Sequence, residues 1–119
     1  MTNSQKSLEF EHRITQFGLE VIRFCKTIPE DTISRPIINQ LVRSATSIGA
    51  NYAEANNAAS KKDFANKINI CRKEAQETKH WLTMCSEITD NSAREILFQE
   101  CHELILIFNR ISATMRNGK

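Results

Sequence analysis

The chain has 119 residues, of which 40% are hydrophobic and 25% charged, and its formal net charge is +2. This length fits one domain, a single four-helix bundle that we assign to residues 1–119, and three glycines and two prolines are too few for a fold rich in hairpin turns. The small net charge does not by itself indicate a protein that binds polyanions.

Signals for export or membrane insertion are not visible in the sequence. The N-terminal segment lacks the apolar stretch of a signal peptide, and the apolar run at residues 104–108 is far shorter than the roughly 20 residues that cross a bilayer. The four cysteines are widely spaced and form no CxxC pair; they are Cys25, Cys71, Cys85 and Cys101. We therefore expect a cytoplasmic protein without membrane contact, whose free cysteines behave as small hydrophobic residues.

Apolar residues at steps of three and four predict four helices. A connection that contains a proline joins the first two. The first helix spans about residues 7–27 and ends before Pro29. The second spans about residues 35–57, with Ser34 as its N-cap and Pro36 in its first turn, where the missing N–H of proline costs nothing. The core-facing stripe of the second helix consists of Ile38, Leu41, Ala45, Ile48 and Tyr52.

The third and fourth helices each begin with a capping box, a serine followed three residues later by an acidic residue. Ser60 and Asp63 form the first box, at the start of a helix over about residues 61–88. Ser92 and Glu95 form the second box, at the start of a helix over about residues 93–115. Short connections between helices of similar length predict an all-α fold, an antiparallel up-down four-helix bundle.

One turn of the fourth helix, residues 104–108, is apolar around its whole circumference. In a lone bundle the outer side of this turn would face water, so its composition predicts burial on both sides. In so small a chain, the outer side of this turn can be buried by another subunit. We therefore assign Ile105, Leu106 and Ile107 to an interface between copies. The alternative is a bundle that is twisted enough to cover these side chains itself.

The second helix carries a polar stripe beside its apolar one, and the residues of this polar stripe are Arg43, Ser47, Asn51 and Glu54. Arg43 and Glu54 are three turns apart, which is too far for a direct ion pair. The stripe is then either a hydrogen-bonded layer that fixes the register between helices or a contact surface for a subunit or ligand.

No arrangement of catalytic or metal-binding residues stands out. Two Glu-x-x-His pairs, Glu9 with His12 and Glu77 with His80, resemble the ligand pattern of di-iron bundles. At about 100° per residue both pairs point away from the apolar stripes, so four ligands cannot converge in the core. A phosphate-binding glycine loop and a nucleophile elbow are also absent. We therefore expect a protein that is not an enzyme and that holds no metal or cofactor.

Positive charge is concentrated in the middle of the chain, between residues 35 and 79, where basic residues outnumber acidic ones. A basic surface of this kind attracts the phosphate backbone of nucleic acids. The candidate nucleic-acid contacts are Lys62, Lys67, Arg72, Lys73 and Lys79. The alternative is a pair of ordinary solvated helix faces.

The second helix and the start of the third resemble a known bacterial family. The matching residues are Gln40-Leu41-x-Arg43-Ser44-Ala45-x-Ser47-Ile48-x-x-Asn51-x-x-Glu54 and then Lys62-Asp63-Phe64. This pattern is similar to that of the four helix bundle protein family, which includes proteins encoded by intervening sequences within 23S ribosomal RNA genes. The chain departs from the family at Ala55, where glycine is usual, and at Tyr52, which replaces an aliphatic residue.

The resemblance implies a homo-oligomer, typically a five-fold ring of bundles, with no known enzymatic activity. A related group, the accessory protein of diversity-generating retroelements, is a basic five-fold barrel that binds a reverse transcriptase and nucleic acid. Two hypotheses follow for this chain. It is an assembly module that binds RNA or DNA, alone or beside a nucleic-acid enzyme such as a reverse transcriptase, or it is a structural or protein-interaction ring with no nucleic-acid role.

Overall fold

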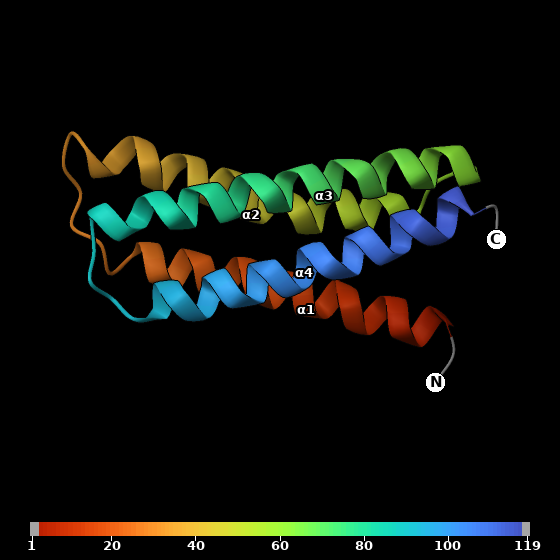
Figure 1. Cartoon of the computed structure of the whole chain (residues 1–119), viewed down its shortest axis with the longest axis horizontal. Coiled ribbons are helices and arrows are strands. Elements are labelled where there is room, and N and C mark those ends of the chain that lie inside the picture. Colours follow the sequence, from red (N-terminus) through yellow and green to blue (C-terminus); the bar gives the residue numbers. More distant parts are fainter. Residues whose placement is uncertain (1–2, 118–119) are drawn as a thin grey trace.

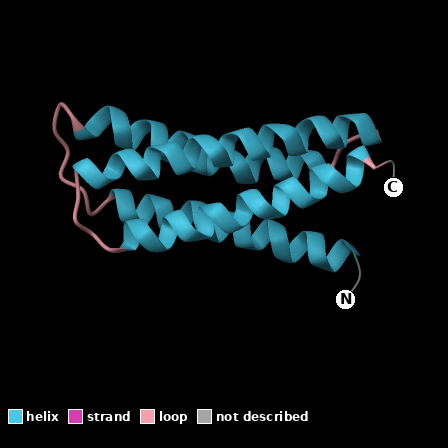
Figure 2. Cartoon of the chain, viewed as in Figure 1, coloured by secondary structure: helices cyan, strands magenta, loops and turns pink. Residues whose placement is uncertain are grey.

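The computed structural model describes residues 3–117, which form four α-helices and one short 3-10 helix. These elements are α1 (Asn3–Cys25), α2 (Ser34–Asn56), α3 (Lys61–Met84), the 3-10 helix η1 (Cys85–Glu87) and α4 (Ala93–Arg116). Figure 1 shows the helices in antiparallel order, and in Figure 2 the loops are confined to the ends of the bundle. The predicted all-α four-helix bundle is confirmed. No helix within the described residues is long and apolar enough for a membrane span.

Helices that follow one another in the sequence are neighbours in space, and the contact between α2 and α3 is the most extensive. The bundle measures 47 × 25 × 20 Å. Of the four neighbouring pairs, α1 and α4 have the least contact, and they diverge toward the end of the bundle that holds both termini (Figure 1). The first turns of α1 therefore lie at the edge of the bundle, where Leu8 is 68% exposed.

The core is built from one apolar stripe of each helix, and an aromatic cluster extends it toward the termini. The ring of Phe10 lies 5.0 Å from that of Tyr52 and 5.3 Å from that of Phe108. The phenol oxygen of Tyr52 lies 2.9 Å from the hydroxyl of Ser7, so the buried tyrosine keeps a polar partner. Tyr52, at a position where the family pattern has an aliphatic residue, thus ties α1 to α2.

The start of α2 is capped by a residue other than the predicted one. The carboxylate of Asp31 accepts hydrogen bonds from the backbone N–H groups of Ser34 at 2.7 Å and Ile33 at 2.9 Å. These backbone hydrogen bonds lower the pKa of Asp31. Ser34 is the first residue of the helix, and its hydroxyl donates to the carbonyl oxygen of Pro29 at 2.8 Å. The prediction of Ser34 as the N-cap is therefore wrong.

The two predicted capping boxes have different outcomes. Ser60 accepts the N–H of Asp63 at 3.1 Å, which confirms the cap of α3. Ser92 makes no side-chain cap, because the side-chain oxygen of Asn91 accepts the N–H of Ala93 at 3.0 Å instead. Other boundaries also shift. The first helix begins at residue 3 and ends at residue 25, and the third tightens into η1 after residue 84.

All four cysteines are free and buried, as the apolar stripes predict. Burial raises the pKa of the Cys25, Cys71 and Cys101 thiols to about 12 and that of Cys85 to about 11. The thiols therefore stay protonated at neutral pH and pack as small hydrophobic groups.

Candidate functional site

The polar stripe of α2 contacts α3 at both of its ends. The guanidinium of Arg43 pairs with Glu77 and, at 3.4 Å, with Glu74. At the other end, the carboxylate of Glu54 accepts a hydrogen bond from the ammonium of Lys67, with 2.7 Å between Oε1 and Nζ. The side chains of Arg43 and Glu54 are 48% and 59% exposed, so each ion pair contributes little to stability by itself. The cross-helix partners of these two residues come from α3, so the stripe links two helices of one chain.

The middle of the stripe is bonded within α2. Ser47 donates to the carbonyl oxygen of Arg43 at 3.0 Å, and Asn51 donates to that of Ser47 at 2.8 Å.

Beside the polar stripe, the hydroxyl of Thr78 donates a hydrogen bond to the hydroxyl of Ser44 at 2.9 Å, and both residues are fully buried. This hydroxyl pair joins α3 to α2 inside the core, where a polar contact needs its partner in place.

Two of the five candidate nucleic-acid contacts, Lys67 and Lys79, have their charged groups engaged by another helix. Lys67 is paired with Glu54. The ammonium of Lys79 lies 5.3 Å from the ring centroid of Phe98 and 3.3 Å from Nδ1 of His102. An ammonium over an aromatic face is stabilised by the ring. Both lysines thus have partners within the chain.

The other three candidates, Lys62, Lys73 and Arg72, form no ion pair with any residue between 3 and 117. Lys62 and Lys73 are exposed on α3. Arg72 is half-buried and donates to the side-chain oxygen of Asn69 at 2.8 Å. The guanidinium carries five N–H donors, so this one bond leaves most of them for another acceptor.

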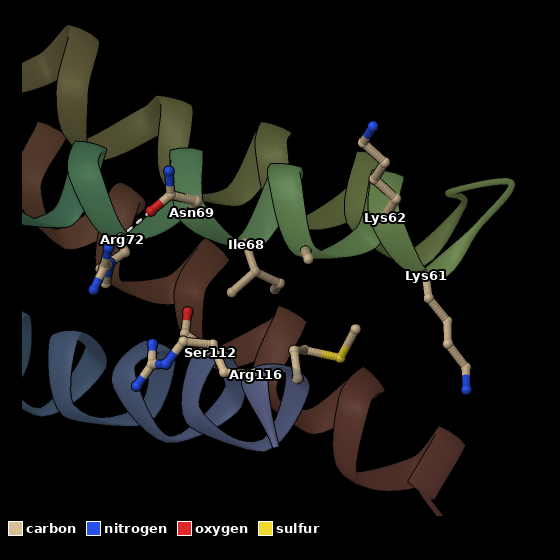
Figure 3. A pocket seen from close by; sticks show the side chains of 9 residues that line it. Lys61, Lys62, Ile68, Asn69, Arg72, Ser112 and Arg116 are labelled. Carbon is tan, nitrogen blue, oxygen red and sulfur yellow. Dashed lines mark hydrogen bonds between the residues drawn. The ribbon is translucent and has the colours of Figure 1, made fainter. Parts of the chain in front are cut away.

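A groove of about 540 Å³ between the start of α3 and the end of α4 gathers four basic side chains. Lys61, Lys62 and Arg72 come from α3, and Arg116 comes from α4; among residues 3–117, no carboxylate side chain lines the groove. Figure 3 shows Arg72 and Arg116 toward one end of it and Lys61 at the other, while Lys62 points away from α4. Positive charge without a neighbouring carboxylate makes this groove the strongest candidate for an anion site on the described surface.

Two groove cations, Lys61 and Arg116, are not among the five predicted contacts, and Arg116 is the one that comes from another helix. It lies far from Arg72 in the chain, and only the packing of α4 against α3 brings the two together. A basic residue in the last turn of a helix also has an ordinary role, since it offsets the partial negative charge of the helix C-terminus. The sequence therefore offers no separate signal for a ligand role of Arg116.

The Glu-x-x-His pairs lie outside the core. Between residues 3 and 117, no group of three or more His, Cys, Asp and Glu side chains is arranged to hold a metal ion. Glu77 accepts hydrogen bonds from Arg43 and from the indole N–H of Trp81, and the ring of His80 packs edge-on against Trp81. Burial alone would raise the pKa of Glu77, but the hydrogen bonds from Arg43 and Trp81 lower it below its usual value.

The three predicted interface residues of α4 lie in different environments. Ile105 is 4% exposed and packs in the core of the monomer, which leaves almost none of its surface for the predicted contact between copies. Its burial follows from a wide apolar stripe on α4, to which Leu104 and Phe108 also belong. Leu106 is 39% exposed and Ile107 is half-buried. The outward part of this turn therefore consists of Leu106, with Ile107 at its edge.

The comparisons with known proteins agree with this architecture. The sequence model of the 23S rRNA-intervening sequence protein family matches residues 6–110. The chain belongs to this family. The family resemblance that the Gln40–Glu54 pattern indicates is thereby confirmed. A comparison with curated proteins gives no match.

A solved structure supports the assignment. The chain is similar to a protein with unknown function from the S23 ribosomal protein family of Bacteroides thetaiotaomicron VPI-5482, whose crystal structure superposes with a TM-score of 0.77. The two sequences are 30% identical, and the match covers 91% of this chain and 98% of that one. The family and its four-helix fold are thus established from sequence and structure together.

Proposed function

We propose that the chain is a non-enzymatic, homo-oligomeric helical-bundle module that binds RNA or DNA through the basic residues of α3 and the end of α4. The observation that carries this proposal is the α3–α4 groove, which four cations line and to which no described residue contributes a carboxylate. Such a surface keeps a positive potential that attracts phosphate groups. The exposed ammonium of Lys73 extends this potential along α3.

Binding of this kind is electrostatic and depends little on the base sequence of the nucleic acid. Lysine and arginine contacts to phosphate fix the position of a nucleic acid but carry no base information. Each phosphate contact releases a counterion, so affinity falls steeply as salt rises. We expect weak binding by one copy, since the number of free cations at the groove is small.

Assembly would strengthen this binding by repeating the groove around one axis. The exposed Leu106, with Ile107 beside it, supports a contact between copies, and the family resemblance favours a ring of five. Linked copies engage one strand at high effective concentration, so avidity exceeds the affinity of a single groove. A nucleic-acid enzyme, such as a reverse transcriptase, is the protein partner that this role would suit.

The proposal includes no chemical step by the bundle. A thiolate rather than a thiol is the nucleophile in cysteine chemistry, and burial raises the pKa of all four cysteines. A buried, protonated thiol is a poor nucleophile at neutral pH.

The alternative is a structural or protein-interaction ring with no nucleic-acid role. It is favoured by the ion pairs of Arg43 and Lys67, because these compensate part of the positive charge that the sequence places in α2 and α3. The two functions differ in whether the remaining free cations contact phosphate.

Titration of labelled single- and double-stranded RNA and DNA at low salt separates the two functions. The test variant is Lys62→Glu with Lys73→Glu, which reverses two exposed charges on α3. Its matched control is Arg23→Glu with Lys26→Glu, which makes the same change in net charge at exposed positions near the end of α1. We expect salt-sensitive binding that the α3 variant loses and the α1 variant largely keeps. Absence of binding to every nucleic acid, or equal losses in both variants, would favour the interaction ring.

A further inference from the structure

The α3–α4 groove has an apolar wall in addition to its cations. Ala65 of α3 and Met115 of α4 form this wall over the core residue Ile68, which is buried and points from α3 toward α4 in Figure 3. Its volume of about 540 Å³ lies within the range of about 300–1,000 Å³ that is common for small-molecule sites. A surface built only for a phosphate backbone needs no such wall. The groove thus suits an anion that also carries an apolar body.

Polar donors gather at one end of this wall. Arg72, Ser112 and Arg116 line the same groove, and Figure 3 shows all three at the end away from Lys61. Arg72 gives one hydrogen bond to Asn69, and the hydroxyl of Ser112 has no hydrogen bond to any residue from 3 to 117. Guanidinium groups bind phosphate oxygens in a two-pronged geometry, and a hydroxyl adds a third donor.

We propose that the groove binds one nucleotide unit, with its phosphate held by Arg72 and Arg116 and its base against Met115. The thioether of methionine makes favourable contacts with aromatic rings and adapts to their shape. A base inside a duplex is stacked and paired, so only a free nucleotide or an unpaired residue of a strand can reach this wall. The inference rests on the proposed function, because the same cations serve both, and it adds a preference for unpaired nucleotides.

Methyl NMR of the methionines tests this placement in the full chain. The chain has three methionines, at positions 1, 84 and 115, and Met84 at the far end of α3 serves as an internal reference. The probes are adenosine 5′-monophosphate, a single-stranded oligoadenylate RNA, and inorganic phosphate at matched ionic strength. We expect the Met115 signal to shift with the two adenine-containing probes much more than with phosphate, while the Met84 signal stays in place.

Two variants add a quantitative readout. Arg72→Gln should raise the dissociation constant for the nucleotide by about tenfold, the effect of losing one charge-assisted contact. Ala65→Leu fills part of the groove without changing charge and should weaken binding to a similar degree. Gln76→Leu is its control, since residue 76 is exposed on α3 and does not line the groove. Circular dichroism of each variant verifies that the bundle is folded.

The outcomes are distinct. A Met115 shift with both adenine-containing probes assigns the site to free nucleotides and strands alike, and a shift with the oligonucleotide alone assigns it to strands. The inference is overturned if neither probe moves the Met115 signal or if inorganic phosphate moves it as far. Salt-sensitive binding of the oligonucleotide that leaves Met115 unmoved overturns the placement of a base against Met115, but it leaves phosphate contact by the basic residues, and with it the proposed function, standing. Absence of oligonucleotide binding, by contrast, counts against the proposed function itself.

Discussion

Lys67 and Glu54 form an ion pair across the contact between α3 and α2, with 2.7 Å between Nζ and Oε1. The hydrogen bond to Glu54 raises the pKa of Lys67. Lys67 therefore stays charged, but its ammonium group is already bound to a carboxylate of the same chain. Lys62, on the same helix, has no such partner among the described residues. Two lysines separated by little more than one turn of α3 are therefore unequal in their availability to a ligand.

Neutralising each of these lysines should separate their roles. Lys62→Gln removes a free cation, so the slope of log Kd against log salt for RNA binding should fall by about one. Lys67→Gln makes the same change in net charge but removes a residue that already has a partner, so the slope should stay close to that of the wild type. Binding curves measured at several salt concentrations provide the comparison. Equal changes in slope for the two variants would show that the pairing of Lys67 does not matter for the ligand.

Leu106→Glu should weaken self-association more than it weakens the fold. A glutamate at this exposed position is solvated in the monomer but would be buried in an interface between copies. Light scattering coupled to gel filtration should give a wild-type mass near five times the 13.6 kDa of one chain and a smaller mass for the variant. Ile96→Glu, at another exposed apolar position of α4, is the control. A wild-type monomer at micromolar concentration would rule out the proposed assembly.

Thr78→Val should lower the free energy of unfolding by about 1 kcal/mol, because Ser44 loses the hydrogen bond that Thr78 donates to it in the core. Adding Ser44→Ala removes the polar group left behind, so the double variant should lose less than the two single variants together. Chemical denaturation of all four proteins measures this coupling. Strictly additive losses would mean that the two hydroxyls do not depend on each other.

Cys101 should make the protein less stable at alkaline pH. Burial raises the pKa of this thiol to about 12, whereas the unfolded chain has the lower value of an ordinary cysteine. The resulting stability is fully present below the unfolded pKa and is lost as pH rises toward the folded pKa. Cys101→Ala removes a buried side chain, so this variant should be less stable than the wild type at neutral pH by about 1 kcal/mol. Because it lacks the thiol, its free energy of unfolding should fall less between pH 8 and 11. Parallel stability curves for the two proteins would contradict this.

The four helices could be predicted from the sequence because each buries a stripe at helical spacing. Their starts were harder to predict, since Asp31 and Asn91 precede the serines at positions 34 and 92 and present an oxygen to the first N–H groups. The side-chain oxygens of aspartate and asparagine readily accept nearby backbone N–H groups. The burial of Ile105 within one copy could not be predicted either, because a turn that is apolar on all sides does not show how wide the core-facing stripe of α4 is.

The candidate site was only partly predictable. Lys62 and Arg72 stand out as basic residues on α3, but whether a lysine is paired depends on the rotation of α2 against α3, as the contact between Lys67 and Glu54 shows. Arg116 joins the groove only because the end of α4 packs beside the start of α3. Sequence spacing within one helix carries no information about either relationship.

If the free cations at the α3–α4 groove contact phosphate, binding of single-stranded RNA must depend on salt, and this dependence can be measured. With four such contacts, affinity should fall roughly fiftyfold between 50 and 200 mM salt. In Arg72→Gln with Arg116→Gln the affinity should be lower at both concentrations, and its dependence on salt should be weaker. An RNA affinity that responds neither to salt nor to these two substitutions would contradict phosphate contact at the groove.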